Sequence, residues 1–146
     1  MQIEIKLDAT TKEPKVVVYT DKMTDEVQEL VKRISEEGPK MLAGFKDDVL
    51  SILEQDDIIR IYAANAKVFA VTAKGEYLIR LRLYEMENRL DKNRFVRISN
   101  SEIINLKMVK GFDLSYTGTI CVTLKNGTVT YVSRRYVAKI KQVLGI

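Results

Sequence analysis

The sequence predicts a mainly β protein, α+β overall, that begins with a small β-β-α extension. From residue 47 onward, short apolar runs recur at close intervals and are separated by turn residues, which is typical of β-rich units. Helical spacing of apolar residues is confined to one segment in the extension, one mid-chain and one at the C-terminal end. The 146 residues, 46% of them hydrophobic, suffice for one domain with its own core and a small extension.

The N-terminal extension has a β-β-α pattern. Residues 1–7 and 15–19 are expected to form two short strands. Thr24 is a favourable N-cap for the helix that follows, and Gly38-Pro39 is expected to end it. One apolar stripe runs along this helix at positions i, i+3, i+4 and i+7, formed by Val27, Leu30, Val31 and Ile34. A segment this short cannot bury a core alone, so it must pack on the main domain or on another subunit.

The domain boundary is expected near residues 41–46, so that 1–45 form an interaction or dimerisation extension and 46–146 form the main domain. Expected strands of the main domain span 49–53, 58–63, 68–72, 76–80, 95–99, 112–116, 120–124 and 129–132, and expected helices span 83–90 and 134–144. Asn126-Gly127 predicts a two-residue type I′ turn, because both central positions of that turn need positive φ. Cys121 in this hairpin is expected to be a small packing residue, with a redox role as the alternative.

The segment 95–105 combines a strand with a polar turn. Ser99, Asn100 and Ser101 are three short polar residues in succession, which favour a turn. An Asn side chain matches the N6 and N7 edge of adenine, and Ser hydroxyls suit phosphate oxygens. The competing interpretation is an ordinary turn between strands.

The C-terminal helix breaks a rule of helix stability. Ser133 can cap it, but Arg134 and Arg135 occupy its first turn, where cations oppose the helix dipole. A local rule broken without evident gain marks a candidate functional site. An anionic partner would reverse the sign of the effect, because helix amides and guanidinium groups both bind phosphate, and Arg also pairs with guanine. The alternative is an arginine pair within a surface ion-pair cluster.

Positive charge is concentrated at the C-terminal end. The net charge is +4, yet residues 92–146 hold 10 Lys and Arg against only Glu102 and Asp113. This excess is expected of a surface that binds a polyanion, and a solvated basic surface is the alternative. One cysteine excludes an internal disulfide, and the absence of histidine removes the commonest general base and metal ligand. With no apolar run near the roughly 20 residues that span a bilayer and no signal-peptide core, we expect a cytoplasmic protein.

Three motifs occur in order along the main domain: Phe95-x-Arg97-x-x-x-Ser101-x-Ile103-Ile104-Asn105-Leu106, the Asn126-Gly127 pair, and Val132-Ser133-Arg134-Arg135-Tyr136. Over about residues 47–146 this order resembles the LytTR family, the LytR/AgrA-like DNA-binding domain of bacterial transcription regulators. The resemblance implies an elongated bundle of antiparallel sheets with a short mid-domain helix and a C-terminal helix. It also implies sequence-specific binding to double-stranded DNA through loops that enter successive major grooves, without a helix-turn-helix.

The resemblance implies where DNA contacts fall in this chain. Base-contacting positions of the family fall on Asn100, on Arg135 and in the loop 64–67. Many members have His then Arg where this chain has Ser99-Asn100, which leaves the preferred bases open. The candidate DNA-binding residues are Asn100, Arg135, Arg134, Lys67, Asn65, Ser99, Ser101 and Lys107.

The resemblance further implies a stand-alone regulator, because 45 residues cannot hold a receiver domain of about 100 residues. Double-stranded DNA is the expected partner, and a homodimer or a small membrane regulatory protein is a candidate partner of the acidic helix 24–37. We expect no cofactor, no metal, no small-molecule substrate and no enzymatic activity. The alternative function is a protein–protein interaction module that uses exposed β edges, although this function does not explain the charge excess.

Overall fold

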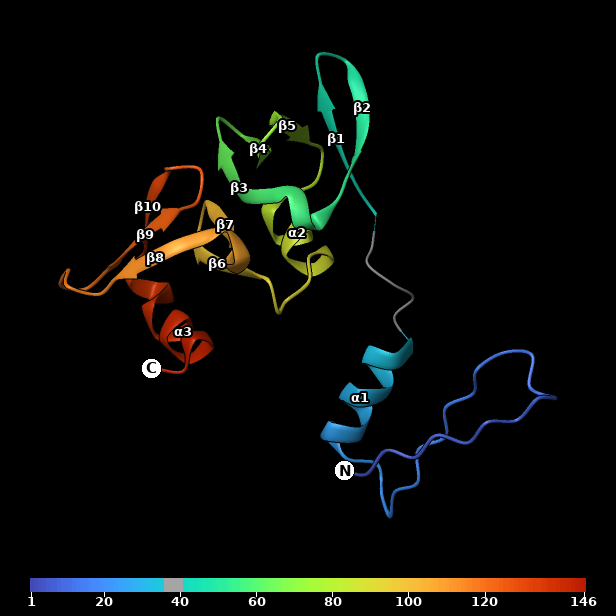
Figure 1. Ribbon diagram of the computed structural model, residues 1–146. Helices are drawn as coiled ribbons and strands as arrows, with labels where there is room; N and C mark the ends of the chain where they lie inside the picture. The colour runs from blue at the N-terminus through green and yellow to red at the C-terminus, as the bar shows by residue number, and fades with distance from the viewer. Residues whose placement is uncertain (36–40) are drawn as a thin grey trace. The chain divides into compact units, whose positions relative to one another are not determined.

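The computed structural model describes residues 1–35 and 41–146 (Figure 1). The chain divides into two compact units, Met1–Glu37 and Gly38–Ile146. Among the described residues, the smaller unit contains one helix, and the larger unit contains two α-helices and all of the strands. The fold is therefore mainly β, which confirms the predicted class.

The larger unit begins with strands and ends with a helix. Its elements in chain order are β1 (Leu42–Lys46), β2 (Val49–Leu53), the 3-10 helix η1 (Gln55–Asp57), β3 (Ile58–Ala64), β4 (Lys67–Thr72), β5 (Gly75–Ile79), α2 (Leu83–Arg89), β6 (Phe95–Ser99), β7 (Glu102–Asn105), the 3-10 helix η2 (Leu106–Met108), β8 (Val109–Asp113), β9 (Ile120–Leu124), β10 (Val129–Val132) and α3 (Arg134–Leu144). Most of these elements lie where the apolar patterns predicted them.

The strands form two antiparallel sheets. The large sheet has the strand order β2-β1-β5-β4-β3-β7-β6, and the small sheet has the order β10-β9-β8. The start of α3 lies against β6, because the Ser133 amide donates a hydrogen bond to the Ile98 carbonyl at 2.9 Å. The helix that follows the small sheet is thereby attached to the edge strand of the large sheet.

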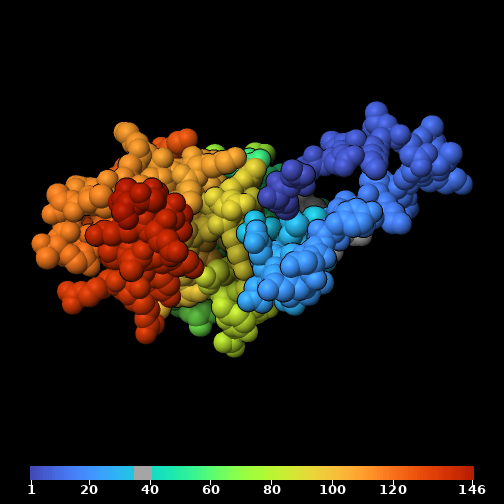
Figure 2. Space-filling view, turned by 90° about the horizontal axis from the view of Figure 1, so that it is seen from below, coloured from blue at the N-terminus to red at the C-terminus, as the bar shows by residue number. Residues whose placement is uncertain are grey.

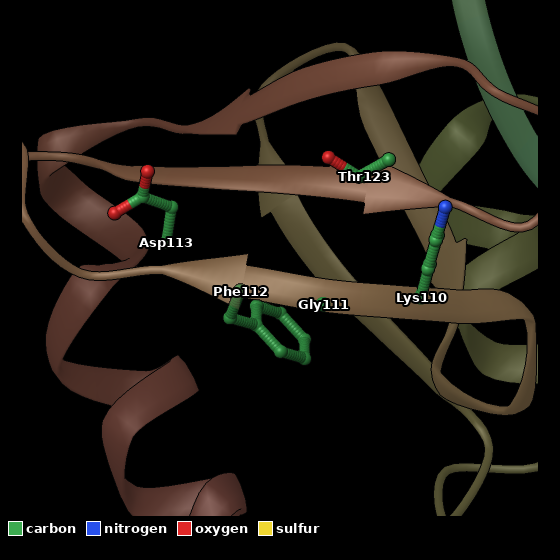
Figure 3. A pocket seen from close by; sticks show the side chains of 5 residues that line it. All are labelled: Lys110, Gly111, Phe112, Asp113 and Thr123. Carbon is green, nitrogen blue, oxygen red and sulfur yellow. The ribbon is translucent and has the colours of Figure 1, made fainter.

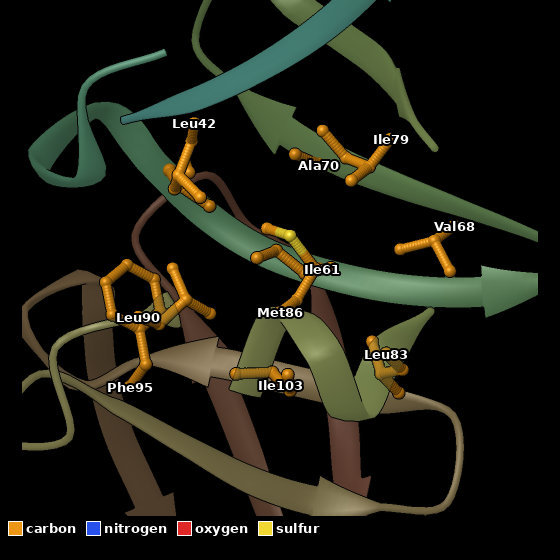
Figure 4. Close-up of a cluster of buried hydrophobic side chains, with 11 residues drawn as sticks. Leu42, Ile61, Val68, Ala70, Ile79, Leu83, Met86, Leu90, Phe95 and Ile103 are labelled. Carbon is orange, nitrogen blue, oxygen red and sulfur yellow. The ribbon is translucent and has the colours of Figure 1, made fainter. Parts of the chain in front are cut away.

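Two hydrophobic cores lie on opposite faces of the large sheet. Consecutive residues of β7 point to different cores: Ile103 packs in the core around α2, and Ile104 packs in the core around α3. In the α2 core, Met86 of α2 lies close to Ile61 of β3 (Figure 4). The α3 core contains Ile140 of α3 together with residues of both sheets, so it joins the two sheets.

The smaller unit contains the expected helix, α1 (Asp25–Ser35). Thr24 caps it, because Thr24 Oγ1 accepts a hydrogen bond from the Val27 amide at 3.2 Å. The expected helix end at Gly38-Pro39 lies outside the described residues.

The two strands expected in the extension are not formed. Residues 1–7 and 15–19 contain no strand, so this part of the prediction is wrong. Alternation in the sequence had indicated strands, but Ile3 is 83% exposed and Leu7 is 96% exposed, with no layer covering them. Two short strands without a covering layer are at best marginally stable in water.

The domain boundary lies earlier than the sequence predicted. Residues 42–46 form β1, which pairs with β2 and, through Phe45 and Leu78, with β5. Leu42 is 2% exposed and packs in the α2 core. A Cβ at Gly44 would lie 2.7 Å from the Cβ of Tyr77, so glycine allows this close contact. The expected boundary after residue 45 is therefore corrected to one after residue 37.

The β9–β10 hairpin also differs from the prediction. The Leu124 amide donates to the Thr128 carbonyl at 2.8 Å, and the Gly127 amide donates to the Leu124 carbonyl at 2.9 Å. Within this loop only Gly127 has positive φ, at 89°, so the predicted two-residue type I′ turn at Asn126-Gly127 is wrong. The hairpin instead has a three-residue loop that ends in a left-handed glycine. Two-residue turns with positive φ at both central residues occur at Asp47-Asp48 and Asn65-Ala66.

Candidate nucleic-acid interface

Three polar segments lie together at one end of the large sheet. The Ala63 amide of β3 donates to the Ser101 carbonyl at 2.8 Å, which places the β3–β4 turn beside the β6–β7 turn. The Tyr136 hydroxyl of α3 donates to Asn100 Oδ1 at 3.2 Å, which joins the helix to the β6–β7 turn. We name this end of the sheet the turn edge, and define it by residues 65–67, 99–101 and 134–136.

The β6–β7 turn presents Asn100 outward. Ser99 Oγ accepts a hydrogen bond from the Ser101 amide at 3.2 Å and lies 3.3 Å from Ser101 Oγ, so both hydroxyls are used within the turn. Arg97 donates to the carbonyls of Ser99 and Asn100 at 2.8 and 2.7 Å. Apart from Tyr136, the exposed Asn100 side chain has no hydrogen-bond partner among the described residues. Its amide nitrogen is therefore available to an external acceptor.

The first turn of α3 contains two arginines and no acidic residue. Figure 2 shows α3, in red, exposed along one face of the larger unit. Ser133 occupies the expected N-cap position, but its side chain makes no capping hydrogen bond. The Arg134 guanidinium lies beside Gly118 in the β8–β9 loop, with a nitrogen 3.4 Å from where a Cβ would stand. In residues 41–146 neither Arg134 nor the exposed Arg135 has an ion-pair partner, so the alternative of an ion-pair cluster is not supported.

The β3–β4 turn contributes the remaining candidates at the turn edge. Asn65 and Ala66 have φ of 52° and 61°, a left-handed conformation that Asn tolerates better than most residues. Asn65 and Lys67 are both exposed, with Lys67 at the first position of β4. Together with the other two segments, this turn lines the sheet end with amide and cationic groups.

Lys107 does not belong to the turn edge. It lies in η2, after the end of β7, whereas Ser101 precedes the start of β7. The four residues of β7 lie between the two positions and span about 13 Å at about 3.3 Å per residue. All other candidate DNA-binding residues lie at the turn edge.

Two basic residues of the C-terminal excess are paired with acids. Arg97 Nη1 lies 2.9 Å from Glu87 Oε2, and Arg94 pairs with Asp56 and Asp91. These cations are already neutralised and cannot all serve a polyanion. The cations that the turn edge exposes are Lys67, Arg134 and Arg135.

A buried carboxylate behind the turn edge is not evident from the sequence. Glu102 is 6% exposed and accepts hydrogen bonds from Arg60 Nε and Thr130 Oγ1, each at 2.6 Å. It therefore links β3, β7 and β10 across the two sheets. The Arg60 guanidinium also lies 4.4 Å from the ring centre of Tyr62. Desolvation of Tyr62 and its hydrogen bond to Glu76 raise the pKa of this tyrosine.

A shallow hollow of about 330 Å³ lies on the small sheet (Figure 3). It is lined by Lys110, Gly111, Phe112, Asp113 and Thr123. The Asp113 carboxylate accepts hydrogen bonds from the hydroxyl and the amide of Ser115, at 2.6 and 2.9 Å, and these bonds lower its pKa. The single carboxylate of the hollow is thus held by its own loop.

Residues 1–35 and 41–146 contain no group of three or more His, Cys, Asp or Glu side chains able to hold a metal ion. None of the helices in these residues has the length and hydropathy to cross a membrane. Cys121 is a free thiol that is 9% exposed.

Comparison with known proteins places this geometry in a family. Residues 48–145 match the family model of the LytTr DNA-binding domain. Two uncharacterised HTH-type transcriptional regulators of Staphylococcus aureus, from strains NCTC 8325 and COL, are each 33% identical over 147 aligned positions, covering 100% of this chain and 99% of each relative. In this chain, however, five strands separate α2 from α3, so these helices do not form a helix-turn-helix.

A solved structure has the same fold. The LytTr DNA-binding domain of a response regulator from Bacillus cereus aligns with a TM-score of 0.71 and 21% identity, covering 75% of this chain and 100% of that domain. At this identity the likeness shows the fold alone, and the family model and the Staphylococcus relatives supply the sequence link. The chain belongs to the LytTR family of DNA-binding domains.

Proposed function

We propose that this protein is a transcription regulator that binds double-stranded DNA sequence-specifically through its turn edge. The hydrogen bond between Tyr136 and Asn100 carries the proposal, because it places an exposed amide beside the two unpaired arginines of α3. The family supports DNA as the partner, and the names of the Staphylococcus relatives support the role in transcription. Such a regulator acts in the cytoplasm, where bacterial DNA lies.

In the proposed complex, the turn edge faces the duplex, and loops of the larger unit enter successive major grooves. Asn100 and Arg135 contact base edges, since amide and guanidinium groups form paired hydrogen bonds with adenine and guanine, respectively. Asn65 is the third base contact. Arg134 and Lys67 contact phosphates, which fix the position of the protein on the duplex without selecting a sequence.

Selection of bound duplexes from a random pool tests this function. The protein is expected to enrich a defined sequence, and log K for that duplex should fall linearly with log[salt], with a slope of about −0.9 per phosphate contact. Failure to enrich any sequence would contradict specific recognition. A slope near zero would remove DNA as the partner.

The same titration tests whether DNA binds at the turn edge or along the whole basic surface. Arg134→Ala should weaken all duplexes about equally and make the slope shallower by about one, because it removes one phosphate contact. Lys107→Ala is the matched control, and it should change neither quantity. It removes the same charge, but the length of β7, about 13 Å, separates Lys107 from the β6–β7 turn, and this exceeds the Debye length of about 8 Å at physiological salt. Equal effects of the two substitutions would mean that DNA follows the whole length of the domain.

The smaller unit is proposed to mediate self-association. Ile34 of α1 is 49% exposed and Leu30 is half-buried, so part of the apolar stripe of this helix is open to solvent. A unit of this length cannot cover the stripe with its own residues. We favour a second copy of the chain as the partner, and a small membrane regulatory protein is the alternative.

Leu30→Asp should shift the protein toward the monomer, because it places a charge in the proposed interface. Sedimentation velocity measures the change. Gln28→Asp is the matched control, since it adds the same charge at an exposed position of α1 outside the stripe. A wild-type protein that sediments as a monomer at all concentrations would contradict self-association and favour the alternative partner.

One observation favours a protein-interaction role as the second candidate function. β2 is an edge strand of the large sheet, and it exposes Val49, Leu50 and Ile52 at 62%, 57% and 64%. An exposed apolar edge can pair with a strand of another protein. Binding through this edge would be insensitive to salt, in contrast to binding at the turn edge.

A further inference from the structure

Arg97 contacts the β6–β7 turn from inside the domain. Its Nε donates to the Ser99 carbonyl at 2.8 Å and its Nη2 donates to the Asn100 carbonyl at 2.7 Å. Its Nη1 donates to Glu87 Oε2 of α2 at 2.9 Å. The Arg97 side chain is only 14% exposed. One guanidinium therefore connects α2 to two successive carbonyls of the turn.

The position of Arg97 follows from the alternation of β6. Arg97 is on the same side of the strand as Phe95, which packs in the α2 core. α2 covers that side of the sheet, so its Glu87 meets the guanidinium. Glu87 and Arg97 are ten residues apart and lie on different elements, so no local sequence pattern predicts their contact.

We propose that Arg97 and Glu87 form a clamp that holds the β6–β7 turn in the conformation that presents Asn100, and that Arg97 is a positioning residue and not a phosphate ligand. This inference rests on the proposed function and deepens it. It assigns a specificity role to a pair of residues that do not touch DNA themselves.

Geometry and energetics support the clamp. The planar guanidinium fork supplies donors in fixed directions, which a lysine ammonium on its flexible stem cannot reproduce. The bond to Glu87 is charge-assisted and stronger than a neutral hydrogen bond. With the turn already ordered, binding DNA does not have to order it, so the contact made by Asn100 retains more of its free energy.

The clamp and a phosphate contact by Arg97 predict opposite effects of Glu87→Ala on affinity for the selected duplex. Removing the carboxylate of Glu87 makes the protein more positive, so simple electrostatics predicts tighter binding to every duplex. The clamp predicts weaker binding to the selected duplex, because Arg97 loses the partner that fixes its guanidinium. Glu87→Ala therefore distinguishes the two roles by the direction of the change.

The experiment measures binding of the full chain to the selected duplex and to a random duplex across a range of salt. Arg97→Lys keeps the charge of the clamp, and Glu87→Ala removes the partner of Arg97. Glu87→Gln keeps a hydrogen-bond acceptor, so it should restore part of the binding that Glu87→Ala loses. Glu54→Ala is the control for loss of an acidic charge, since Glu54 is exposed in η1's capping position and its side chain makes no capping hydrogen bond. Backbone amide NMR shifts and hydrogen exchange of Asn100 and Ser101 in the free protein report the turn directly.

We expect Arg97→Lys and Glu87→Ala each to weaken binding to the selected duplex by about 5-fold or more, the lower bound for loss of a good base contact. Random-duplex binding and the salt slope should stay unchanged for Arg97→Lys, and for Glu87→Ala they should change no more than for Glu54→Ala. The amides of Asn100 and Ser101 should shift and exchange faster in both variants. Wild-type binding by Arg97→Lys, or tighter binding by Glu87→Ala, would overturn the clamp. A wild-type protein without sequence preference would instead contradict the proposed function, and the amide measurements would still test the clamp.

Discussion

Replacing Arg135 with alanine is expected to weaken binding to the selected duplex about 5- to 150-fold, with a much smaller loss on random DNA. The range corresponds to about 1–3 kcal/mol of discrimination for a paired contact to a base edge. Arg135 is exposed in the first turn of α3 and has no ion-pair partner within residues 41–146, so its guanidinium is free to make such a contact. Asn100→Ala should give a loss in the same range, because it removes the amide at the neighbouring segment of the turn edge.

Lys139→Ala is the matched control for Arg135→Ala. Lys139 lies on the same helix, one turn further on, and it is also exposed. Its removal should weaken specific and random duplexes equally or not at all. Titration of each variant with both duplexes at one salt concentration provides the measurement. If Arg135→Ala lost specific and random binding alike, Arg135 would be a phosphate contact.

Thermal unfolding of Arg135→Ala gives an independent check. Since the cation opposes the dipole of α3 in the free protein, its removal should leave the melting temperature unchanged or slightly higher. Loss of stability would show that Arg135 supports the fold and does not serve DNA alone.

The sequence predicted the larger unit well because its elements have strong local patterns. Alternating apolar residues locate β4, for example, since Val68 and Ala70 pack in the α2 core and Phe69 between them is only partly buried. The same kind of pattern misled in the extension, where residues 1–7 alternate but form no strand. Alternation specifies a strand only when a partner strand and a covering layer are present. β1 was missed for the converse reason, because Leu42–Lys46 gains its order from pairing with β2 and β5.

The candidate site could be predicted only as separate segments. The resemblance indicated Asn100 and Arg135, but the contact that joins their segments links residues 36 positions apart, Asn100 and Tyr136. Charge counting also overstated the basic surface, because it included Arg97, which pairs with an acid of α2. Side-chain pairing between distant segments follows from the fold, and local patterns do not encode it.

Replacing Arg60 with methionine is expected to cost about 3–5 kcal/mol of unfolding free energy, the range for removing one partner of a buried ion pair. The Arg60 and Glu102 side chains are 20% and 8% exposed, so solvent screens their interaction little. Without the guanidinium, the carboxylate of Glu102 keeps only the hydroxyl of Thr130 and remains buried without a cation. Urea denaturation at neutral pH measures the loss.

The double variant Arg60→Met with Glu102→Gln should recover most of that stability. Glutamine removes the uncompensated charge and still offers an acceptor to the Thr130 hydroxyl, so the link between β7 and β10 is retained. A cost of less than about 1 kcal/mol for Arg60→Met would show that the pair behaves like an exposed salt bridge. If the cost is large and the double variant recovers it, the burial of charge dominates. The hydrogen bond from the Thr130 hydroxyl to residue 102 would then still link β7 to β10, alongside the α3 core that joins the two sheets.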